Sequence, residues 1–303
     1  MKFDIIGKRF WFFTISGIVI LVGIISLITA GLPSGIEFSS GSLLTVSFQE
    51  DVDHDEFVEE ISNIGYADSI VQETRAGEFL IRTHELTDTE KAEIENALMQ
   101  RFGEVSEAQF TSVSPMIASE TTSNAIIAVV IAAIGILAYV TWAFRRMPKP
   151  LHYGTCAIVA LVHDALIALG VFSILGAIMG LQINLMFITG VLAVIGYSVN
   201  NTVVIFDRIR ENLTKGIGSD FESVVNNSLV ETLGRSVNTS FTTLIVILAL
   251  LFFVGATIQN FVIVLIIGVI AGTFSSVCIA PSLLVVWDNG EWGRFIPRFL
   301  SSK

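Results

Sequence analysis

The stretch "IGYSVNNTVVIFDRIREN" (residues 195–212) decides how this chain is interpreted, because it closes an apolar run that begins near Asn184. Such a run is typical of a membrane-spanning helix. Yet it places Asn200 and Asn201 where lipid would favour leucine. It then ends on a cluster of charged residues, Asp207, Arg208, Arg210 and Glu211. Because polar groups at membrane depth need partners inside a protein, the stretch indicates a helix packed among other helices.

The composition supports a membrane protein. The chain has 303 residues, and only 15% of them are charged; a soluble domain has about 25%. The mean hydropathy is +0.73. The two cysteines, Cys156 and Cys278, both lie in apolar runs, so we expect neither a disulfide framework nor a cysteine-based metal site.

The charge is unevenly distributed. The segment 31–122 carries 19 acidic and only 4 basic residues, whereas the net charge of the whole chain is −11. The remainder is therefore slightly basic. This pattern predicts one acidic, water-exposed domain inserted into a membrane protein.

Six apolar runs have roughly the ~20 residues needed to cross a bilayer. These candidate spans are residues 10–30, 123–144, 153–175, 184–206, 239–256 and 260–286. We therefore expect the N-terminus and first span over 1–30, an outer domain over 31–122, spans two to four over 123–206, a cytoplasmic loop over 207–238, spans five and six over 239–286, and a tail over 287–303.

Basic residues orient these spans. They cluster before the first span and after the second, fourth and sixth, at Lys2, Lys8, Arg9, Arg145, Arg146, Lys149, Arg208, Arg210, Lys215, Arg294, Arg298 and Lys303. Because cytoplasmic loops carry the excess of Lys and Arg, both termini are expected in the cytoplasm and the segment 31–122 outside it. The first run could instead be a signal peptide, but "LITAGLPSG" has no A-x-A site, so we favour an uncleaved anchor.

The outer domain is predicted to be ferredoxin-like. Strand patterns occur at "SLLTVSF", "DSIVQET", "GEFLIRT" and "EAQFTSVS", with a hairpin over Arg75–Gly77. Helix patterns occur at "DHDEFVEEISNIG" and "TDTEKAEIENALMQRFG", the second capped by Thr87 or Thr89. The resulting order is β-α-β-β-α-β. His54 and His84 are single histidines beside acids and suggest a solvated surface, not a catalytic set.

Polar residues occur at two places within the predicted spans and at a third at the entry to the fifth span. They are His163 and Asp164; Tyr197, Ser198, Asn200 and Asn201; and Arg235, Asn238, Thr239 and Ser240. The Asn and Ser side chains could simply bond between packed helices. Asp164 needs a partner or a proton, and Arg235 is either that partner or a side chain that reaches to the inner interface.

The charged exit at 207–211 is expected to hold the helix end at the cytoplasmic surface. The following segment, 219–233, has apolar residues on one side, and Ser219 or Asp220 is placed to cap it. It is predicted to be an amphipathic helix that lies along the inner interface before the chain re-enters the membrane.

These motifs resemble the SecD/SecF family of protein-export subunits, in the RND superfamily, and specifically its SecF type. The resemblance covers nearly the whole chain, and its segments are "GIEFSSG" (35–41), "HD" (163–164), the stretch 195–212, "TLGRSVNTS" (232–240) and "IGVIAGTFSSVCIAPSLL" (267–284). The residues that match the family motifs are Gly35, Ile36, Glu37, Phe38, Gly41, Gly196, Asp207, Arg208 and Arg210.

The resemblance implies a polytopic α-helical protein of the bacterial or archaeal-type cell (inner) membrane, with six transmembrane helices and an extracytoplasmic ferredoxin-like α+β domain between the first two. It implies pairing with SecD and association with the SecYEG channel and with YajC- or YidC-like proteins. It also implies contact with unfolded preprotein and lipids, and an ion gradient as the energy source. No enzymatic activity, cofactor, metal or nucleic acid is expected.

One departure from the family concerns Asn201. The family reads G-Y-S-x-N-D where this chain has residues 196–201, and its aspartate is assigned to proton conduction together with the arginine that matches Arg235. An amide cannot bind and release a proton near neutral pH. SecD could supply the carboxylate, Asp164 could supply it, or the site could favour Na⁺. A milder departure is Ser40, which replaces a glycine of the motif.

Three hypotheses follow. In the first, the chain is an ion-gradient-coupled accessory subunit of protein export, with Asp164, Asn201 and Arg235 on the ion pathway and Tyr197, Ser198, Asn200 and Asn238 in polar helix packing. In the second, it is part of an RND-type exporter of small molecules or lipids. In the third, it is a structural clamp for SecD without an ion path of its own.

Overall fold

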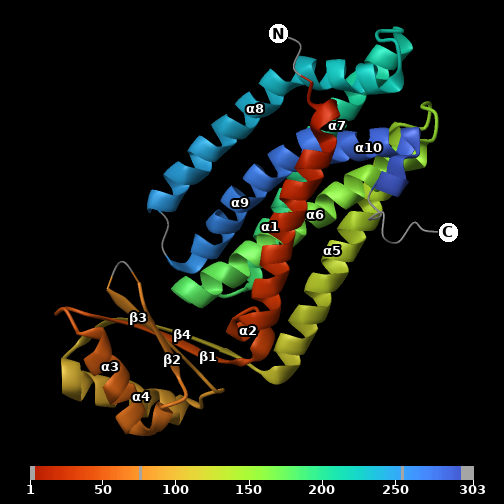
Figure 1. The fold of residues 1–303 in the computed structure, drawn as a ribbon. Helices are drawn as coiled ribbons and strands as arrows, with labels where there is room; N and C mark the ends of the chain where they lie inside the picture. The colour runs from red at the N-terminus through yellow and green to blue at the C-terminus, as the bar shows by residue number, and fades with distance from the viewer. Residues whose placement is uncertain (1–3, 75–76, 254–255, 295–303) are drawn as a thin grey trace. The chain divides into compact units, whose positions relative to one another are not determined.

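The computed structural model describes residues 4–74, 77–253 and 256–294, and it divides into two compact units (Figure 1). Unit 1 comprises Met1–Leu32, Ala128–Leu181 and Met186–Lys303, and unit 2 comprises Pro33–Ile127 and Gln182–Leu185. The helix α5 begins in unit 2 and continues into unit 1. Each unit has its own hydrophobic core and is described separately.

Unit 1 is built from long helices that lie side by side (Figure 1). They are α1 (Arg9–Thr29), α5 (Pro115–Ala143), α6 (Pro150–Met179), α7 (Leu185–Thr214), α8 (Phe221–Phe253), α9 (Ala256–Phe274) and α10 (Ala280–Asn289). The described residues include six helical segments long and apolar enough to cross a membrane, with α9 and α10 joined into one. The prediction of six membrane helices is thereby confirmed, although most helices extend beyond the predicted spans.

The helix α1 contacts the bundle along one narrow stripe. Its buried residues are Arg9, Ser16 and Gly23, spaced seven apart. Gly23 packs directly on Gly170 of α6, because a Cβ atom on Gly170 would lie only 2.6 Å from the Cα atom of Gly23. Small residues let the two backbones approach this closely, as they do in many membrane helix pairs.

Two hydrogen bonds repeat the same alignment of α1 and α6. Ser16 bonds to His163 and Ser26 bonds to Ser173, and each pair is separated by 147 residues and joined over 2.9 Å. The constant separation means that the two helices run parallel. Ser173 in turn donates to the carbonyl of Gly31 over 2.7 Å, which ties the end of the first span to α6.

The core of unit 1 gathers at the end of the bundle where α5 ends and α6 begins. Phe144 stacks on Tyr153 with ring centroids 5.2 Å apart, and Phe206 of α7 meets both rings edge-on. Val225 and Leu229 of α8 belong to the same buried cluster. This end of the bundle is therefore held by close apolar packing from four helices.

The segment 219–233 differs from its predicted form. It does not make a separate helix, because residues from Phe221 onward form the first turns of α8, which continues without interruption to Phe253. Asp220 caps this helix, since its Oδ1 accepts the backbone N–H of Ser223 over 2.7 Å. The amphipathic pattern is real, but its apolar side packs into the core of unit 1 through Val225 and Leu229.

The last span contains a π-helical turn, η3 (Ser275–Ile279), between α9 and α10. Pro281 follows at the start of α10 and has no N–H to donate to the preceding turn. A π-helical turn widens the helix by one residue and often lies at a functional site.

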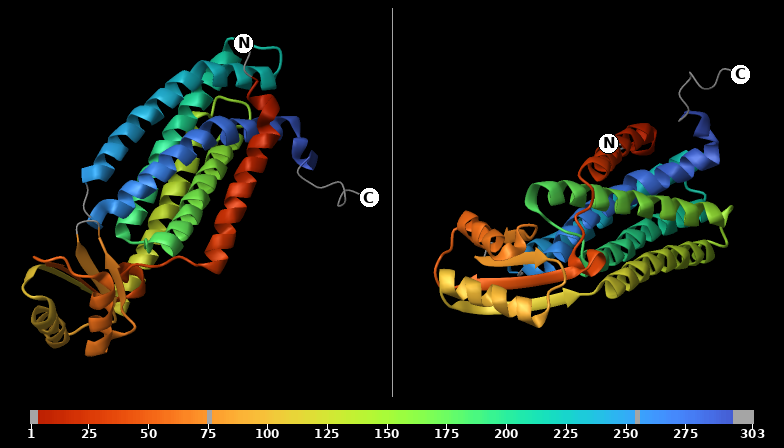
Figure 2. Two further views of the ribbon diagram at one scale, coloured as in Figure 1. Left: turned by 60° about the vertical axis from the view of Figure 1, so that its left-hand side comes forward. Right: turned by 90° about the horizontal axis from the view of Figure 1, so that it is seen from below.

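Unit 2 contains a four-stranded antiparallel sheet in the order β2-β3-β1-β4. Its strands are β1 (Gly41–Phe48), β2 (Ile70–Glu73), β3 (Glu78–Thr83) and β4 (Val105–Val113). The helices α3 (His54–Ile61) and α4 (Asp88–Phe102) lie on the same face of this sheet (Figure 2). The core between the layers includes Leu44, Val46, Phe57, Phe79, Ile81, Ile94 and Leu98. The predicted β-α-β-β-α-β order and ferredoxin-like class are confirmed.

The helix caps of unit 2 follow from its sequence. Asp53 accepts two backbone N–H groups at the start of α3, and Thr87 forms a capping box with Glu90 at the start of α4. The cap of α4 is therefore Thr87, not Thr89. Gly103 ends α4 with φ of 92°, a conformation that favours glycine. In the predicted Arg75–Gly77 hairpin, residues 75–76 lie outside the described residues.

Candidate functional site

A fully enclosed carboxylate lies at the centre of the helix bundle. Asp164 of α6 is 1% exposed. Its Oδ2 accepts hydrogen bonds from the hydroxyls of Ser198 (2.5 Å) and Ser275 (2.9 Å), and its Oδ1 lies 3.0 Å from Nδ1 of His163. We call these residues, together with Ser16, the Asp164 cluster. It joins α1, α6, α7 and the π-helical turn η3.

The cluster reaches α1 through His163. The Nε2 atom of His163 lies 2.9 Å from the hydroxyl of Ser16, and both residues are 6% exposed. The imidazole also stacks on Phe274, with ring centroids 6.2 Å apart. The imidazole is thus held between a hydroxyl on one side and a carboxylate on the other, an arrangement that can pass a proton along a hydrogen-bonded chain.

Close helix packing places Ser198 within reach of Asp164. A Cβ atom on Gly272 of α9 would lie 2.9 Å from the Cβ atom of Ser198, so the absence of a side chain lets α7 approach. Ser275 follows within the next turn and points its hydroxyl at the same oxygen of Asp164. Two hydroxyl donors from two helices therefore converge on one carboxylate oxygen.

The electrostatics of the Asp164 cluster are unusual. Two hydroxyls donate to one carboxylate oxygen of Asp164, and an imidazole nitrogen lies beside the other. Within the described ranges, no Arg or Lys side chain bonds to Asp164, and its partners are two serines and a histidine. A buried charge without a compensating charge is destabilising, so protonation of the pair or binding of a cation would relieve it.

A second polar network lies between α7, α8 and α9. Tyr197 donates its hydroxyl to Ser240 over 2.9 Å, and Ser240 donates to the carbonyl of Ser236 over 2.9 Å. The hydroxyl of Thr273 lies 2.6 Å from that of Ser240. These side chains bond between packed helices, which is one of the roles that the sequence predicts for Tyr197.

Asn201 is buried, and the nitrogen of its side-chain amide is unpaired. It is 4% exposed, and its Nδ2 has no hydrogen-bond partner among the described residues; the same holds for the hydroxyl of Ser236. Asn201 lies one turn after Tyr197 on α7, and Ser236 one turn before Ser240 on the antiparallel α8. The two unpaired groups therefore occupy the same level of the α7–α8 pair.

Arg235 lies on a different face. It is exposed, as are Asn238 on α8 and Gly196 and Asn200 on α7. The Arg235 side chain forms no hydrogen bond or ion pair with the described part of the chain, so the expectation that it could pair with Asp164 is wrong. The reason is helical geometry: the neighbouring Ser236 faces inward, and successive residues on a helix point about 100° apart.

The charged exit of α7 is held by α8. Arg208 donates to Glu231 and to Glu211 over 2.6 Å each, and Asn212 donates to Ser228 and Glu231 over 2.9 Å each. These charged and polar side chains therefore join α7 to α8 within unit 1. A second pair, Arg210 with Asp207, lies on the same turns of α7.

The "GIEFSSG" motif forms a structural junction within unit 2. Its first residues run beside the loop between α6 and α7, where Gly35 donates its N–H to the carbonyl of Ile183 over 2.7 Å. Residues Ile36–Ser39 form the short helix α2, which places Glu37 and Phe38 ahead of β1. Arg82 of β3 donates to Gln182 over 2.9 Å and also to Ser39. Burial lowers the pKa of Arg82 from its ordinary value.

Ser40 stands where the family motif has a glycine. Its backbone has a positive φ, a conformation that glycine adopts freely and serine adopts only with strain. Its φ is 62°, and the following Gly41 has φ of 120°. A side chain at Gly41 would collide with the carbonyl of Thr83. The motif therefore needs glycine at its second small position and tolerates serine at the first.

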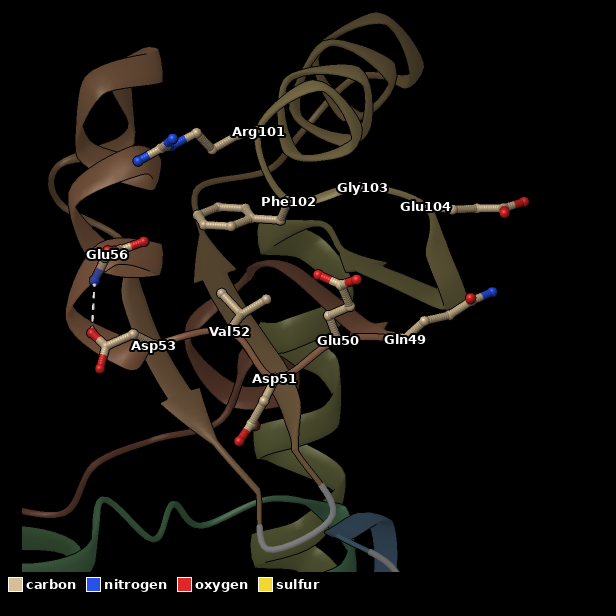
Figure 3. A pocket seen from close by; sticks show the side chains of 10 residues that line it. All are labelled: Gln49, Glu50, Asp51, Val52, Asp53, Glu56, Arg101, Phe102, Gly103 and Glu104. Atoms are coloured by element: carbon tan, nitrogen blue, oxygen red, sulfur yellow. Dashed lines mark hydrogen bonds between the residues drawn. The ribbon is translucent and has the colours of Figure 1, made fainter.

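An acidic depression of about 460 Å³ lies in unit 2, lined by Glu50, Asp51, Asp53, Glu56, Arg101, Phe102 and Glu104 among others (Figure 3). Asp53 is engaged in capping α3, and Phe102 packs on Phe48 and Phe57. The other carboxylates point in different directions (Figure 3). Asp53 and Phe102 therefore stabilise the fold, and the other carboxylates do not converge on one point.

Sequence reasoning missed some of the site residues. Ser16 and Ser275 complete the Asp164 cluster, and Thr273 completes the Tyr197 network. Serine and threonine in membrane helices often bond to their own backbone, so their presence alone does not identify a site. The seven-residue spacing of Arg9, Ser16 and Gly23 is the one signal that could have placed Ser16 on the packing face of α1.

The fold and the buried polar clusters define a class: a multi-pass α-helical membrane protein with an α+β domain between its first two spans and polar networks inside its helix bundle. The model of the family described as "Protein export membrane protein SecD/SecF, C-terminal" matches residues 93–290. The protein translocase subunit SecF of Thermobaculum terrenum is 40% identical over 97% of this chain and 97% of its own length. The chain therefore belongs to the SecD/SecF family, and it is an accessory subunit of the Sec protein translocase.

Other relatives agree. The SecF of Anaerolinea thermophila is also 40% identical, over 97% of both chains. The SecDF of Bacillus subtilis is 33% identical over 96% of this chain, which spans 39% of that protein. The crystal structure of a Thermus SecDF, described as a translocon-associated membrane protein, has a TM-score of 0.84 at 30% identity and covers 95% of this chain and 39% of the other.

Proposed function

We propose that this chain pairs with a SecD-type subunit and that ion flow through the paired membrane helices promotes the late steps of protein export. Both termini are cytoplasmic and unit 2 is extracytoplasmic, as the distribution of basic residues supports. Unit 2 contacts emerging, unfolded preprotein, and the pair associates with the SecYEG channel and with YajC- or YidC-like proteins. The chain acts by binding and movement, not as an enzyme.

The observation that carries this proposal is the exposed polar face of α7 and α8. Gly196 and Asn200 on α7 and Arg235 and Asn238 on α8 are exposed within helices of membrane-spanning length. Asn200 lies within the predicted fourth span, and Arg235 and Asn238 lie at the entry to the fifth; lipid satisfies such polar groups poorly, so we place a protein partner there. In SecDF relatives the corresponding unit is 39% of a longer chain, which supports a SecD-type half as that partner.

The ion pathway is proposed to follow this face. Arg235 lies on the partner-facing side of α8. Asn201 is buried behind this face, one helix turn from the contact between Tyr197 and Ser240. Because Asn201 cannot titrate, the partner supplies a carboxylate opposite Arg235. Asp164 lies deeper, enclosed by its own donors.

Cysteine cross-linking tests the pairing. In a chain with Cys156 and Cys278 replaced by serine, Asn238→Cys is expected to cross-link to single cysteines in the polar membrane helices of the co-expressed SecD. Ile134→Cys is the matched control, because Ile134 on α5 is 62% exposed and the residues three and four positions before and after it are all apolar. Equal cross-linking at both positions, or at neither, would contradict the proposed interface.

The structural clamp is a second candidate, and Asn201 is the observation that favours it. A clamp has no ion path of its own, so Arg235→Ala would leave the gradient-dependent part of preprotein release unchanged. We expect instead that this substitution removes that part, measured in proteoliposomes with SecD and SecYEG under an imposed ΔpH or ΔNa⁺. An unchanged gradient-dependent part would support the clamp.

A further inference from the structure

We propose that the buried His163–Asp164 pair is a proton-binding switch that joins α1 to the π-helical turn of the sixth span. The inference rests on the proposed function, because it identifies the group within this chain on which an ion gradient acts. It places that group inside the Asp164 cluster and apart from the partner-facing Arg235.

The first argument is charge. With a neutral imidazole, the Asp164 cluster carries one negative charge that is enclosed on every side, since Asp164 is 1% exposed. Among the described residues, α9 and η3 contain no charged side chain, and the charged residues of α7 begin at Asp207, about 2.5 turns beyond Ser198. The one charged residue of α1, Arg9, is engaged by Glu222 and Glu291. One proton is therefore the simplest way to neutralise the site.

The second argument is geometry. An ionised carboxylate can only accept, so we assign the hydrogen of the neutral imidazole to Nδ1, which lies 3.0 Å from Oδ1 of Asp164; Nε2, which lies 2.9 Å from the hydroxyl of Ser16, then accepts the hydroxyl hydrogen. An incoming proton binds to the lone pair of Nε2 and makes an imidazolium beside the carboxylate. The net charge of the cluster changes from −1 to 0. Ser16 must then rotate its hydrogen away and accept from Nε2–H.

The third argument is what the proton would move. Ser16 lies on the narrow packing stripe of α1, so reversal of its hydrogen bond acts on the contact between α1 and α6. The imidazolium also draws the negative charge of the carboxylate toward Oδ1, which weakens the bonds that Ser198 and Ser275 donate to Oδ2. Ser275 belongs to the π-helical turn, whose irregular hydrogen bonding makes it easier to rearrange than a regular helix. Ser16 itself is enclosed, which suits a proton relay and not a nucleophile.

Proton uptake can be measured directly by ¹⁵N-histidine NMR of the purified chain in complex with SecD. The chain has four histidines, and His163→Gln assigns the signal of His163. We expect that signal to change from the Nδ1–H tautomer to the imidazolium as pH falls, in the absence of Na⁺. His152, on the same helix and stacked on Trp287 at 4.2 Å, is the matched control, and His152→Gln should leave the titration of His163 unchanged.

Two further variants keep the proposal testable if His163→Gln does not fold. Ser275→Ala removes one donor to the carboxylate, so the midpoint of His163 titration should move to higher pH. Asp164→Asn removes the charge with nearly the same shape, and it should move the midpoint to lower pH and abolish the gradient-dependent part of preprotein release. Size-exclusion profiles and SecD co-purification establish that each variant is folded.

The outcomes separate this inference from the proposed function. A His163 signal that does not titrate, or one that responds to Na⁺ and not to pH, overturns the proton switch, while gradient-driven release by the unmodified chain would still support the proposed function. A titrating His163 in a chain that shows no gradient-dependent release would contradict the proposed function and leave the proton site standing. Retention of full gradient dependence by Asp164→Asn would also overturn the switch.

Discussion

At the scale of single residues, Asn201 shows how an amide changes what a membrane helix can do. Its Nδ2 is buried and has no hydrogen-bond partner among the described residues. Asn201 lies at the same level of the α7–α8 pair as Ser236, one helix turn from the contact between Tyr197 and Ser240. An unpaired buried polar group costs about 1–3 kcal/mol. Asn201 therefore contributes little to stability as it stands, and its place in the bundle is better explained by function than by packing.

Asn201→Asp tests this interpretation. The carboxylate would restore a titrating group, so we expect export to be retained and its dependence on ΔpH to increase relative to ΔNa⁺. Burial of the new charge should lower the melting temperature in detergent, and more so at high pH, where the carboxylate is ionised. Asn200→Asp is the control, because Asn200 is exposed and should leave the melting temperature of the isolated chain almost unchanged. Equal effects of both substitutions would contradict the inward position of Asn201.

Gly170→Ala tests the contact between α1 and α6. The added methyl group would overlap the backbone of Gly23, so we expect a loss of stability of about 1–3 kcal/mol, as for other overpacked contacts. Gly17→Ala is the control, because a Cβ atom there meets nothing within 4 Å. Thermal unfolding of the two variants in the same detergent gives the comparison. A Gly170→Ala chain as stable as Gly17→Ala would show that the helices separate in solution.

The residues of the candidate site could be predicted only in part. His163 and Asp164 are conspicuous because ionisable groups in an apolar run require an explanation. Their partners are hydroxyls from three other helices, and no local pattern shows which serine of a neighbouring span faces them. For the same reason the sequence leaves two places open for Arg235, beside Asp164 or at the inner interface: its spacing places it at the entry to the fifth span but does not determine which way α8 is rotated.

At the scale of elements, α4 depends on its capping box. Thr87→Ala removes the hydroxyl that caps the helix and should destabilise its first turn by about 1 kcal/mol. Hydrogen exchange should become faster at the first amides of α4 and stay unchanged in α3, which has its own cap at Asp53. Faster exchange across all of unit 2 would indicate a global and not a local effect.

The same cap predicts a pH dependence. Hydrogen bonds from the backbone and then the side chain of Thr87 lower the pKa of the Glu90 carboxyl below its ordinary value of 4.5. Because the folded-state pKa is depressed, the stabilisation is fully present at neutral pH and is lost as pH falls below that value. Glu90→Gln should therefore speed exchange at the start of α4 at pH 7, and the difference from the unmodified chain should disappear in acid. A difference that grows in acid would contradict the capping role.

Elements with a strong periodic signal were predictable, and their continuity was not. The strands and helices of unit 2 follow alternating and helical patterns closely, and the caps at Asp53 and Thr87 are typical start signals. The segment 219–233 has an equally clear amphipathic pattern, but the same pattern suits a helix at a membrane surface and a helix packed on a protein core. Only tertiary contacts of Val225 and Leu229 distinguish the two.

At the scale of the whole molecule, the ends of several segments meet at one ion cluster within unit 1. The buried guanidinium of Arg9 bonds to Glu222 at the start of α8 and to Glu291 after α10, over 2.6 and 2.7 Å. Arg9→Met removes the cation that the two carboxylates share; because the Glu222 side chain is 38% exposed, the cost is expected at or below the lower end of the about 3–5 kcal/mol of a fully buried ion pair. We expect a large loss of thermal stability, with partial recovery in Glu222→Gln/Arg9→Met. No recovery would show that packing of the arginine stem, and not its charge, matters most.

The alignment of α1 with α6 also limits how this protein can move. Axial sliding by one helical turn, about 5.4 Å, would bring Gly23 against Leu166 or Ile174 in place of Gly170, and neither side chain leaves room for the backbone. The Ser26–Ser173–Gly31 bonds would be lost at the same time. A piston stroke of α1 is therefore blocked, so any displacement that starts at His163 must reach Gly31 as a tilt that both helices share.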